Sequence, residues 1–441
     1  MTELYELSAA ALATKIRGGE SSATEVARSC CDRIETADPD VKGFVHYDRA
    51  AAMTQAQRLD AGEPRGPLQG VPIAVKDTID VAGFVCSWGS PIHARRVPSH
   101  DALVVQRLRE AGAVIVGTTV STEYAIARAG PTRNPYDLAR TPGGSSSGSA
   151  AVVAANMVPI SVGTQTLGSI VRPSTYCGLY GYKPSVGTIS TNGVMPLTPV
   201  FDAVGPLARC LDDIQLFNAA LSLASGDTPE RRPEGGTPVL QITGPYEERI
   251  EPATAAALHE AATALVAAGY PVTSHALPSR FKSVTECFET IVFRDMARAH
   301  GRDRDEHGDM MSDRFREIID RGRTVNESQY RAALADRQFY REHLDTALGE
   351  NGIVLAPATD GVAPAFSERS GDQKIQSLWS VVGYPALAVP CRPVDELPIG
   401  IQLASRHNRD AAILAMGRVL EANLGHQDAT GISKHRKSAK G

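Results

Sequence analysis

The residues with the clearest chemical potential in this 441-residue chain lie in a short stretch, TPGGSSSGSA, at positions 141–150. Its four serines supply hydroxyl groups, and its three glycines give the backbone unusual freedom. Such a stretch is typical of a flexible linker, a phosphate-binding loop or the nucleophile turn of an α/β-hydrolase. The G-x-S-x-G pattern of that turn is matched by residues 144–148.

Each of these three interpretations meets an objection in the neighbouring sequence. An apolar segment follows directly, which disfavours a linker, and Ser149-Ala150 stand where a phosphate loop requires lysine and a hydroxyl residue. The preceding segment, RNPYDLARTPGG, contains two prolines and does not predict the strand that leads into a hydrolase turn. Late histidines such as His407 exist without a recognisable context, so histidine-assisted catalysis stays as an alternative mechanism.

The elements that must position this stretch alternate between strand and helix. Apolar runs predict strands at 73–75, 114–119 and 158–166, and an alanine-rich run predicts a buried helix at 149–157. This alternation predicts the α/β class, as a single large α/β/α sandwich with a mixed, partly parallel central sheet covered by helices on both faces.

The distribution of strand and helix patterns along the chain also suggests the domain organisation. We expect one domain over residues 1–425, with its core motifs at 70–210 and a helical middle section at about 225–345 that packs beside the sheet. Residues 426–441 form a basic tail that we expect to be flexible.

Several ordered segments resemble the amidase signature family. The longest, TPGGSSSGSAAVVAANMVPISVGTQTLGSIVRPSTYCGLYGYKPS, covers residues 141–185. The others are GVPIAVKD, RNPYD, GTISTNGVMPLTPVFDAVGPLAR, APAT, GYPALAVP and LPIGIQLASRHNRDAAILAMGRVLE. The resemblance covers most of the chain apart from the middle section.

The resemblance implies a serine–cis-serine–lysine triad. Matched to the family's signature, Ser169 is the nucleophile, Ser145 is the bridging serine with a cis peptide bond, and Lys76 is the base. The chemistry is sound, because a serine hydroxyl attacks only when a base removes its proton. A lysine with its ordinary pKa of about 10.4 cannot do so near neutral pH, but burial lowers that pKa.

The resemblance also implies supporting groups around the triad. Backbone N–H groups would form the oxyanion hole, the cluster of donors that stabilises the negative charge of an acyl-transfer intermediate. The expected oxyanion donors are Thr166, Leu167, Gly168 and Ser169. The expected substrate-binding residues are Gly143, Gly144 and Arg172, with Ser146 and Gln165 supporting the triad from behind.

Three positions depart from the family's usual pattern, G-T-D-T-G-G-S-I-R-x-P. Gln165 replaces the acid, Leu167 replaces a glycine, and Arg172 stands three residues after the serine instead of two. This combination resembles the malonamidase-like branch, in which an arginine at this position faces a substrate carboxylate. The resemblance therefore implies a small, carboxylate-bearing amide as the substrate, and a structural brace is the alternative role for Arg172.

We therefore expect an amidohydrolase that cleaves a C–N bond through a seryl acyl-enzyme, with no metal ion and no organic cofactor. The alternatives are the A subunit of a tRNA-dependent amidotransferase and a family scaffold without activity. A charged segment at 300–314 contains two histidines, but its spacing is typical of a solvated helix face rather than a metal site.

The composition of the chain limits the kinds of partner and the cellular location that we expect. The formal net charge of −5 gives no reason to expect nucleic acid or an anionic membrane as a partner. Seven cysteines without a C-x-x-C motif indicate reduced, mostly buried thiols. With no signal-peptide pattern and no long apolar run, we expect a cytoplasmic protein, and a homodimer remains open.

Overall fold

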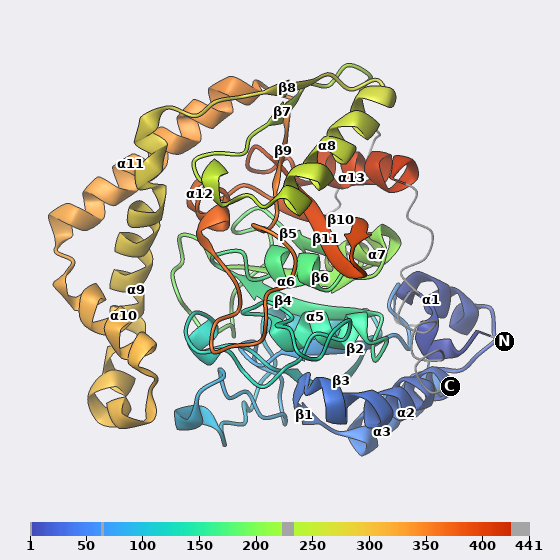
Figure 1. Cartoon of the computed structure of the whole chain (residues 1–441). Helices are drawn as coiled ribbons and strands as arrows, with labels where there is room; N and C mark the ends of the chain where they lie inside the picture. Colours follow the sequence, from blue (N-terminus) through green and yellow to red (C-terminus); the bar gives the residue numbers. More distant parts are fainter. Residues whose placement is uncertain (1, 63–65, 223–232, 425–441) are drawn as a thin grey trace.

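The structure is a computed structural model that describes residues 2–62, 66–222 and 233–424. Its centre is a sheet of eleven strands in the order β1-β3-β2-β4-β6-β5-β10-β11-β9-β7-β8. In Figure 1 this sheet runs from β8 at the top to β1 at the bottom, and helices lie on both sides of it. The predicted α/β fold with a mixed, helix-covered sheet is confirmed, whereas the predicted tail at 426–441 lies outside the described residues.

The strands are β1 (Phe44–Tyr47), β2 (Pro72–Lys76), β3 (Val114–Thr119), β4 (Ile160–Gln165), β5 (Tyr180–Lys183), β6 (Ala203–Ala208), β7 (Val239–Gln241), β8 (Val272–Ser274), β9 (Ile353–Pro357), β10 (Ala386–Val394) and β11 (Leu397–Ser405). Strands β3, β2 and β4 run parallel, as do β9, β7 and β8. The remaining pairs are antiparallel.

The α-helices are α1 (Ala9–Arg17), α2 (Ala23–Val41), α3 (Arg49–Asp60), α4 (Leu103–Glu110), α5 (Ser147–Ala154), α6 (Val171–Tyr176), α7 (Leu211–Ser222), α8 (Pro252–Ala267), α9 (Val284–His307), α10 (Asp313–Thr324), α11 (Glu327–Leu348), α12 (Ser377–Val382) and α13 (Asp410–Asn423). Serine side chains cap the first two, because Ser8 and Ser22 each accept a backbone N–H of the first turn.

Successive side chains of the central strands point to opposite faces of the sheet. On β2, Ile73 and Val75 belong to an apolar cluster that includes residues of α4, α7, α8 and α13. Ala74 belongs instead to the cluster that includes residues of α2, α3 and α5. Because side chains alternate along a strand, Lys76 is directed to the same face as Ala74, the face covered by α5.

The middle section contains helices α8 to α11 and also two strands that the sequence analysis did not assign. Helices α9, α10 and α11 pack on one another at one side of the sheet, on the left in Figure 1. Strands β7 and β8 extend the sheet beyond β9. Each has only three residues, so neither contains the alternation from which a strand is predicted.

Most of the charged segment at 300–314 is exposed to solvent, as the sequence suggested, including Arg302, Asp305, Glu306, His307, Asp309, Asp313 and Arg314, but two of its side chains contact the core. His300 is buried and its Nε2 lies 2.7 Å from the Pro196 carbonyl oxygen. Asp303 accepts a hydrogen bond of 2.8 Å from the Tyr124 hydroxyl. These contacts attach α9 to the core, and in the described residues no group of three or more potential ligands is arranged to hold a metal ion.

All seven cysteines lie in the described residues and are free thiols, as predicted. Cys177 is fully buried and burial raises the pKa of its thiol, which fits a packing role. No helix in the described part of the chain combines the length and the apolar character that crossing a bilayer requires.

Candidate active site

Lys76 ends strand β2 and is completely buried. Its Nζ lies 2.7 Å from Ser145 Oγ and 2.8 Å from Thr164 Oγ1. Burial lowers the pKa of Lys76 to about 7, assisted by the positive charge of Arg172 and opposed by two nearby carboxylates. Near neutral pH this amine is therefore often uncharged, the form that accepts a proton.

One of those carboxylates belongs to the adjacent residue, Asp77. Its Oδ2 accepts hydrogen bonds from Ser87 Oγ at 2.7 Å and from the Gly89 backbone N–H at 3.0 Å. No ion pair with Lys76 is formed in the described residues. Asp77 still opposes the fall in the Lys76 pKa through its charge, but burial outweighs it.

The serine-rich stretch lies at the start of α5, where it meets the end of β2. The peptide bond between Gly144 and Ser145 is cis, as the resemblance implied. Gly143 has a φ of +82°, and a Cβ there would lie 2.9 Å from Pro173 Cα, so both conformation and space require glycine. Ser145 is 2% exposed.

Ser146 connects this stretch to the next segment of the site. Its hydroxyl donates to the Thr164 carbonyl at 3.1 Å, and its backbone N–H donates to the Ser169 carbonyl at 3.3 Å. The residue beside Ser145 is thus tied directly to Ser169.

The loop between β4 and α6 carries Ser169, which is 5% exposed. In the described residues the backbone N–H groups of Leu167, Gly168 and Ser169 donate no hydrogen bond. Gly168 has a φ of +70°, and a Cβ there would lie 2.5 Å from Gln376 Cγ. Three successive free donors in a nearly buried loop match what an oxyanion hole requires.

Gln165 holds the far end of this loop. Its Oε1 accepts hydrogen bonds from the backbone N–H groups of Ile170 at 2.8 Å and Val171 at 3.0 Å. The acid that usually stands here would supply the same acceptor, so the departure from the family's pattern preserves this contact. Leu167 packs its side chain against the apolar cluster of α9, α10 and α11.

Arg172, at the start of α6, is 1% exposed. Its guanidinium donates to the carbonyl of Gly144, to Ser370 Oγ at 3.3 Å and to the Asp372 carbonyl at 3.4 Å. Its Nε has no hydrogen-bond partner, and it forms no ion pair with a carboxylate of the described residues. Arg172 therefore braces the peptide that precedes Ser145, and its positive charge is offset only through space, by the carboxylates of Asp360 and Asp372, with no ion pair among the described residues.

Two further residues of the site were not found from the sequence. Thr164 holds the Lys76 amine, and Asp202 accepts a hydrogen bond of 2.6 Å from Thr166 Oγ1. Burial raises the pKa of Asp202 to about 6. Thr164 could have been found from the sequence, because it precedes Gln165 on β4, the strand that pairs with β2. The spacing of residues around Asp202 gave no indication that it belongs to the site.

The structure thus brings together most of the residues singled out from the sequence. Lys76 and Ser145 are hydrogen bonded, and Ser169 is attached to Ser146 through the backbone. No hydrogen bond joins the hydroxyls of Ser145 and Ser169 in the described residues. Catalytic contacts of this kind often tighten only when substrate binds.

Comparison with curated proteins gives relatives that cover nearly the whole chain. The chain is 30% identical over 479 residues to the A subunit of glutamyl-tRNA(Gln) amidotransferase from Carboxydothermus hydrogenoformans, covering 96% of this chain and 98% of that protein. It is 32% identical over 478 residues to the protein of the same name from Symbiobacterium thermophilum, with the same two coverages, 96% and 98%.

Solved structures of similar proteins also cover nearly the whole chain. A structure described as an amidase is 30% identical with a TM-score of 0.86, covering 95% of this chain and 100% of that chain. The native peptide amidase from Stenotrophomonas maltophilia is 27% identical with a TM-score of 0.84, covering 96% of this chain and 98% of that chain.

A comparison with family models gives the same result on the sequence level. The model described as Amidase matches residues 25–414, a range that includes every residue of the site described above. With the fold, the lysine–serine contact and the relatives in agreement, the chain belongs to the amidase signature family.

Proposed function

We propose that this protein is an amidohydrolase that cleaves the C–N bond of a small amide through an acyl-enzyme on Ser169. The observation that carries this proposal is the buried Lys76 amine, hydrogen bonded to Ser145 and with a pKa lowered to about 7. The three free N–H groups of the loop that holds Ser169 support it.

The proposed mechanism has two stages. Ser169 Oγ attacks the amide carbon, and its proton passes through Ser145 Oγ to the neutral Lys76 amine. The negative charge that develops on the carbonyl oxygen is stabilised by the N–H groups of Leu167, Gly168 and Ser169. The relay then returns the proton to the leaving nitrogen as the C–N bond breaks, and water activated by the same relay hydrolyses the ester.

Ammonia release from small primary amides tests this function directly. We expect the chain, purified alone, to release ammonia from at least one amide, with a matched carboxylic acid as the second product. The panel includes pairs of amides with and without a carboxylate, and the Ser169→Ala variant serves as the blank. If the wild type and the blank release ammonia equally from every amide, the proposal is wrong.

The second candidate is the ammonia-releasing A subunit of a tRNA-dependent amidotransferase. It is favoured by the curated relatives, which bear that name and cover nearly the whole chain. Gln165 and Leu167, which depart from the family's usual pattern, weigh mildly against it. Activity that appears only when B- and C-type partner subunits are added would favour this candidate over the self-contained hydrolase.

We further propose that Arg172 recognises a carboxylate on the substrate. A buried guanidinium without an ion-pair partner is costly, and a bound carboxylate would offset this cost with a planar, bidentate contact. The contact between Arg172 and the Gly144 carbonyl places this charge one residue from Ser145. The substrate anion would therefore lie close to the reacting groups.

The Arg172→Lys variant tests whether Arg172 recognises a substrate carboxylate or only braces the peptide that precedes Ser145. Because lysine keeps the charge but lacks the planar fork, we expect KM for carboxylate-bearing amides to rise about tenfold or more, with a much smaller change for neutral amides. Steady-state kinetics on matched pairs of amides measure the difference. Equal losses on both kinds of amide would show that Arg172 acts only as a brace.

A further inference from the structure

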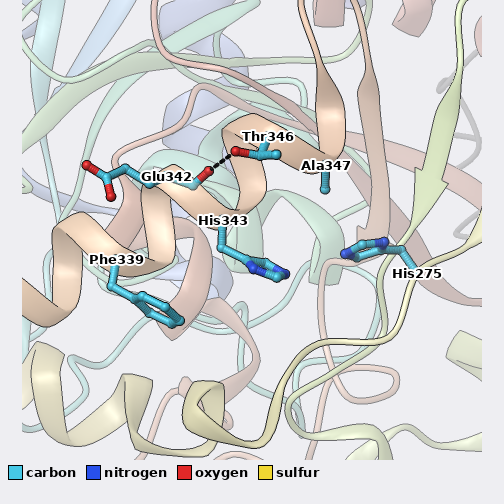
Figure 2. Close-up of a pocket in the computed structure, with 6 residues that line it drawn as sticks. All are labelled: His275, Phe339, Glu342, His343, Thr346 and Ala347. Atoms are coloured by element: carbon cyan, nitrogen blue, oxygen red, sulfur yellow. Dashed lines mark hydrogen bonds between the residues drawn. The ribbon is translucent and has the colours of Figure 1, made fainter.

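A pocket of about 330 Å³ lies at the opposite end of the sheet from the triad. Figure 2 shows the six residues that line it: His275, Phe339, Glu342, His343, Thr346 and Ala347. His275 follows β8, the last strand of the sheet, and the other five residues belong to α11. The mechanism proposed above uses none of them.

Two histidines face each other in this pocket. Their ring centroids are 6.1 Å apart, and Figure 2 shows the two imidazoles pointing toward one another from opposite sides. The Nε2 atom of each ring is buried and has no hydrogen-bond partner in the described residues. Neither shielded nitrogen has a partner in the described residues, so only water or a bound group in the pocket can satisfy them.

Neighbouring aromatic rings restrict the position of the His343 ring, and few other side chains near the two histidines could bind an ion. Phe281 packs edge-on against His343 with ring centroids 5.3 Å apart, and Phe339 lies at 6.3 Å. The Glu342 carboxylate points away from both histidines in Figure 2. Within the described residues this site therefore offers two imidazole nitrogens and no third side-chain ligand.

We propose that His275 and His343 bind one late first-row divalent ion, of the Zn²⁺, Ni²⁺ or Cu²⁺ class, through their Nε2 atoms. Neutral imidazole is a preferred ligand of these ions, whereas Mg²⁺ and Ca²⁺ prefer oxygen. Each Zn–N bond is about 2.0–2.1 Å long, so at a centroid separation of 6.1 Å one ion can contact both rings when it lies between them with a wide N–metal–N angle. Water completes the coordination, and the ion joins the end of β8 to α11.

The test is titration of untagged, EDTA-treated full-length protein with Zn²⁺ by isothermal calorimetry. We expect one site that weakens at least tenfold in His275→Gln and in His343→Gln. His307→Gln is the matched control, because this exposed histidine lies on α9 outside the pocket, and its substitution should leave the affinity unchanged. Far-UV circular dichroism establishes that each variant is folded.

Thermal unfolding supplies a second measurement. Because an ion that binds only the folded state stabilises it, Zn²⁺ should raise the Tm of the wild type and of His307→Gln. The two pocket variants should show no such rise. The proposal is overturned if the wild type takes up no Zn²⁺ at submillimolar concentration, or if all four proteins bind it with the same affinity, since the pocket would then hold only water.

Discussion

Ser169→Ala is expected to lower kcat/KM by roughly four to six orders of magnitude, the loss typical of removing a catalytic nucleophile. Without the hydroxyl no acyl-enzyme forms, and only the contribution of the free N–H groups and of substrate binding remains. Steady-state ammonia release measures the loss. A serine-directed covalent probe should label the wild type and leave the variant unlabelled.

Ser174→Ala is the matched control for this prediction. Ser174 lies on the adjacent helix α6, is buried, and its hydroxyl has no hydrogen-bond partner in the described residues. Its removal should therefore change kcat/KM only slightly. Equal activity of Ser169→Ala and the wild type would assign the nucleophile to another residue, and failure of the probe to label the wild type would favour a scaffold without activity.

Lys76→Met is expected to reduce kcat by about two to four orders of magnitude, the usual contribution of a general base. In the wild type, activity should rise with pH through about 7, because the amine accepts a proton only after it has lost its own. The variant should lack this rise. A pH profile of kcat/KM for both proteins measures the effect, and a flat wild-type profile around pH 7 would contradict the role of Lys76.

Although Lys76→Met should lower activity, it should make the folded protein more stable. Burial lowers the pKa of Lys76 from 10.5 to about 7, so between these values the unfolded chain binds more protons than the folded one. The stability of the wild type should therefore rise with pH across this window. Methionine removes the buried amine, and we expect the variant to have a higher Tm than the wild type near pH 7.

Lys183→Met provides the matched control for both measurements. Lys183 ends strand β5, is 2% exposed, and burial lowers its pKa to about 8. Its Nζ donates to the Pro184 carbonyl at 2.8 Å and contacts neither Ser145 nor Ser169. The control should share the gain in stability and keep its activity. Loss of activity in both variants would show that replacing any buried lysine lowers activity, which would remove the evidence for a proton relay through Lys76.

The sequence predicted the elements that carry long, uniform patterns. Strand β3 has the predicted bounds, and Lys76 stands at the end of its strand as expected. The contacts of Thr164 and Asp202 could not be predicted, because they join side chains across neighbouring strands and loops. Nor could the burial of His300, since the residues that cover it belong to segments far away in the sequence.

The order of strands in the sheet has a consequence for synthesis. Strand β7 pairs with β9 and β8, and β9 reaches the rest of the sheet only through β11, so residues 239–274 find their place only after residue 405 has been translated. Until then the nascent chain carries two short strands and helix α8 without strands β9 and β11, against which they pack. Exposed strand edges of this kind favour aggregation. Ribosome-bound chains that stop before β9 should therefore depend on chaperones more than chains that extend beyond β11.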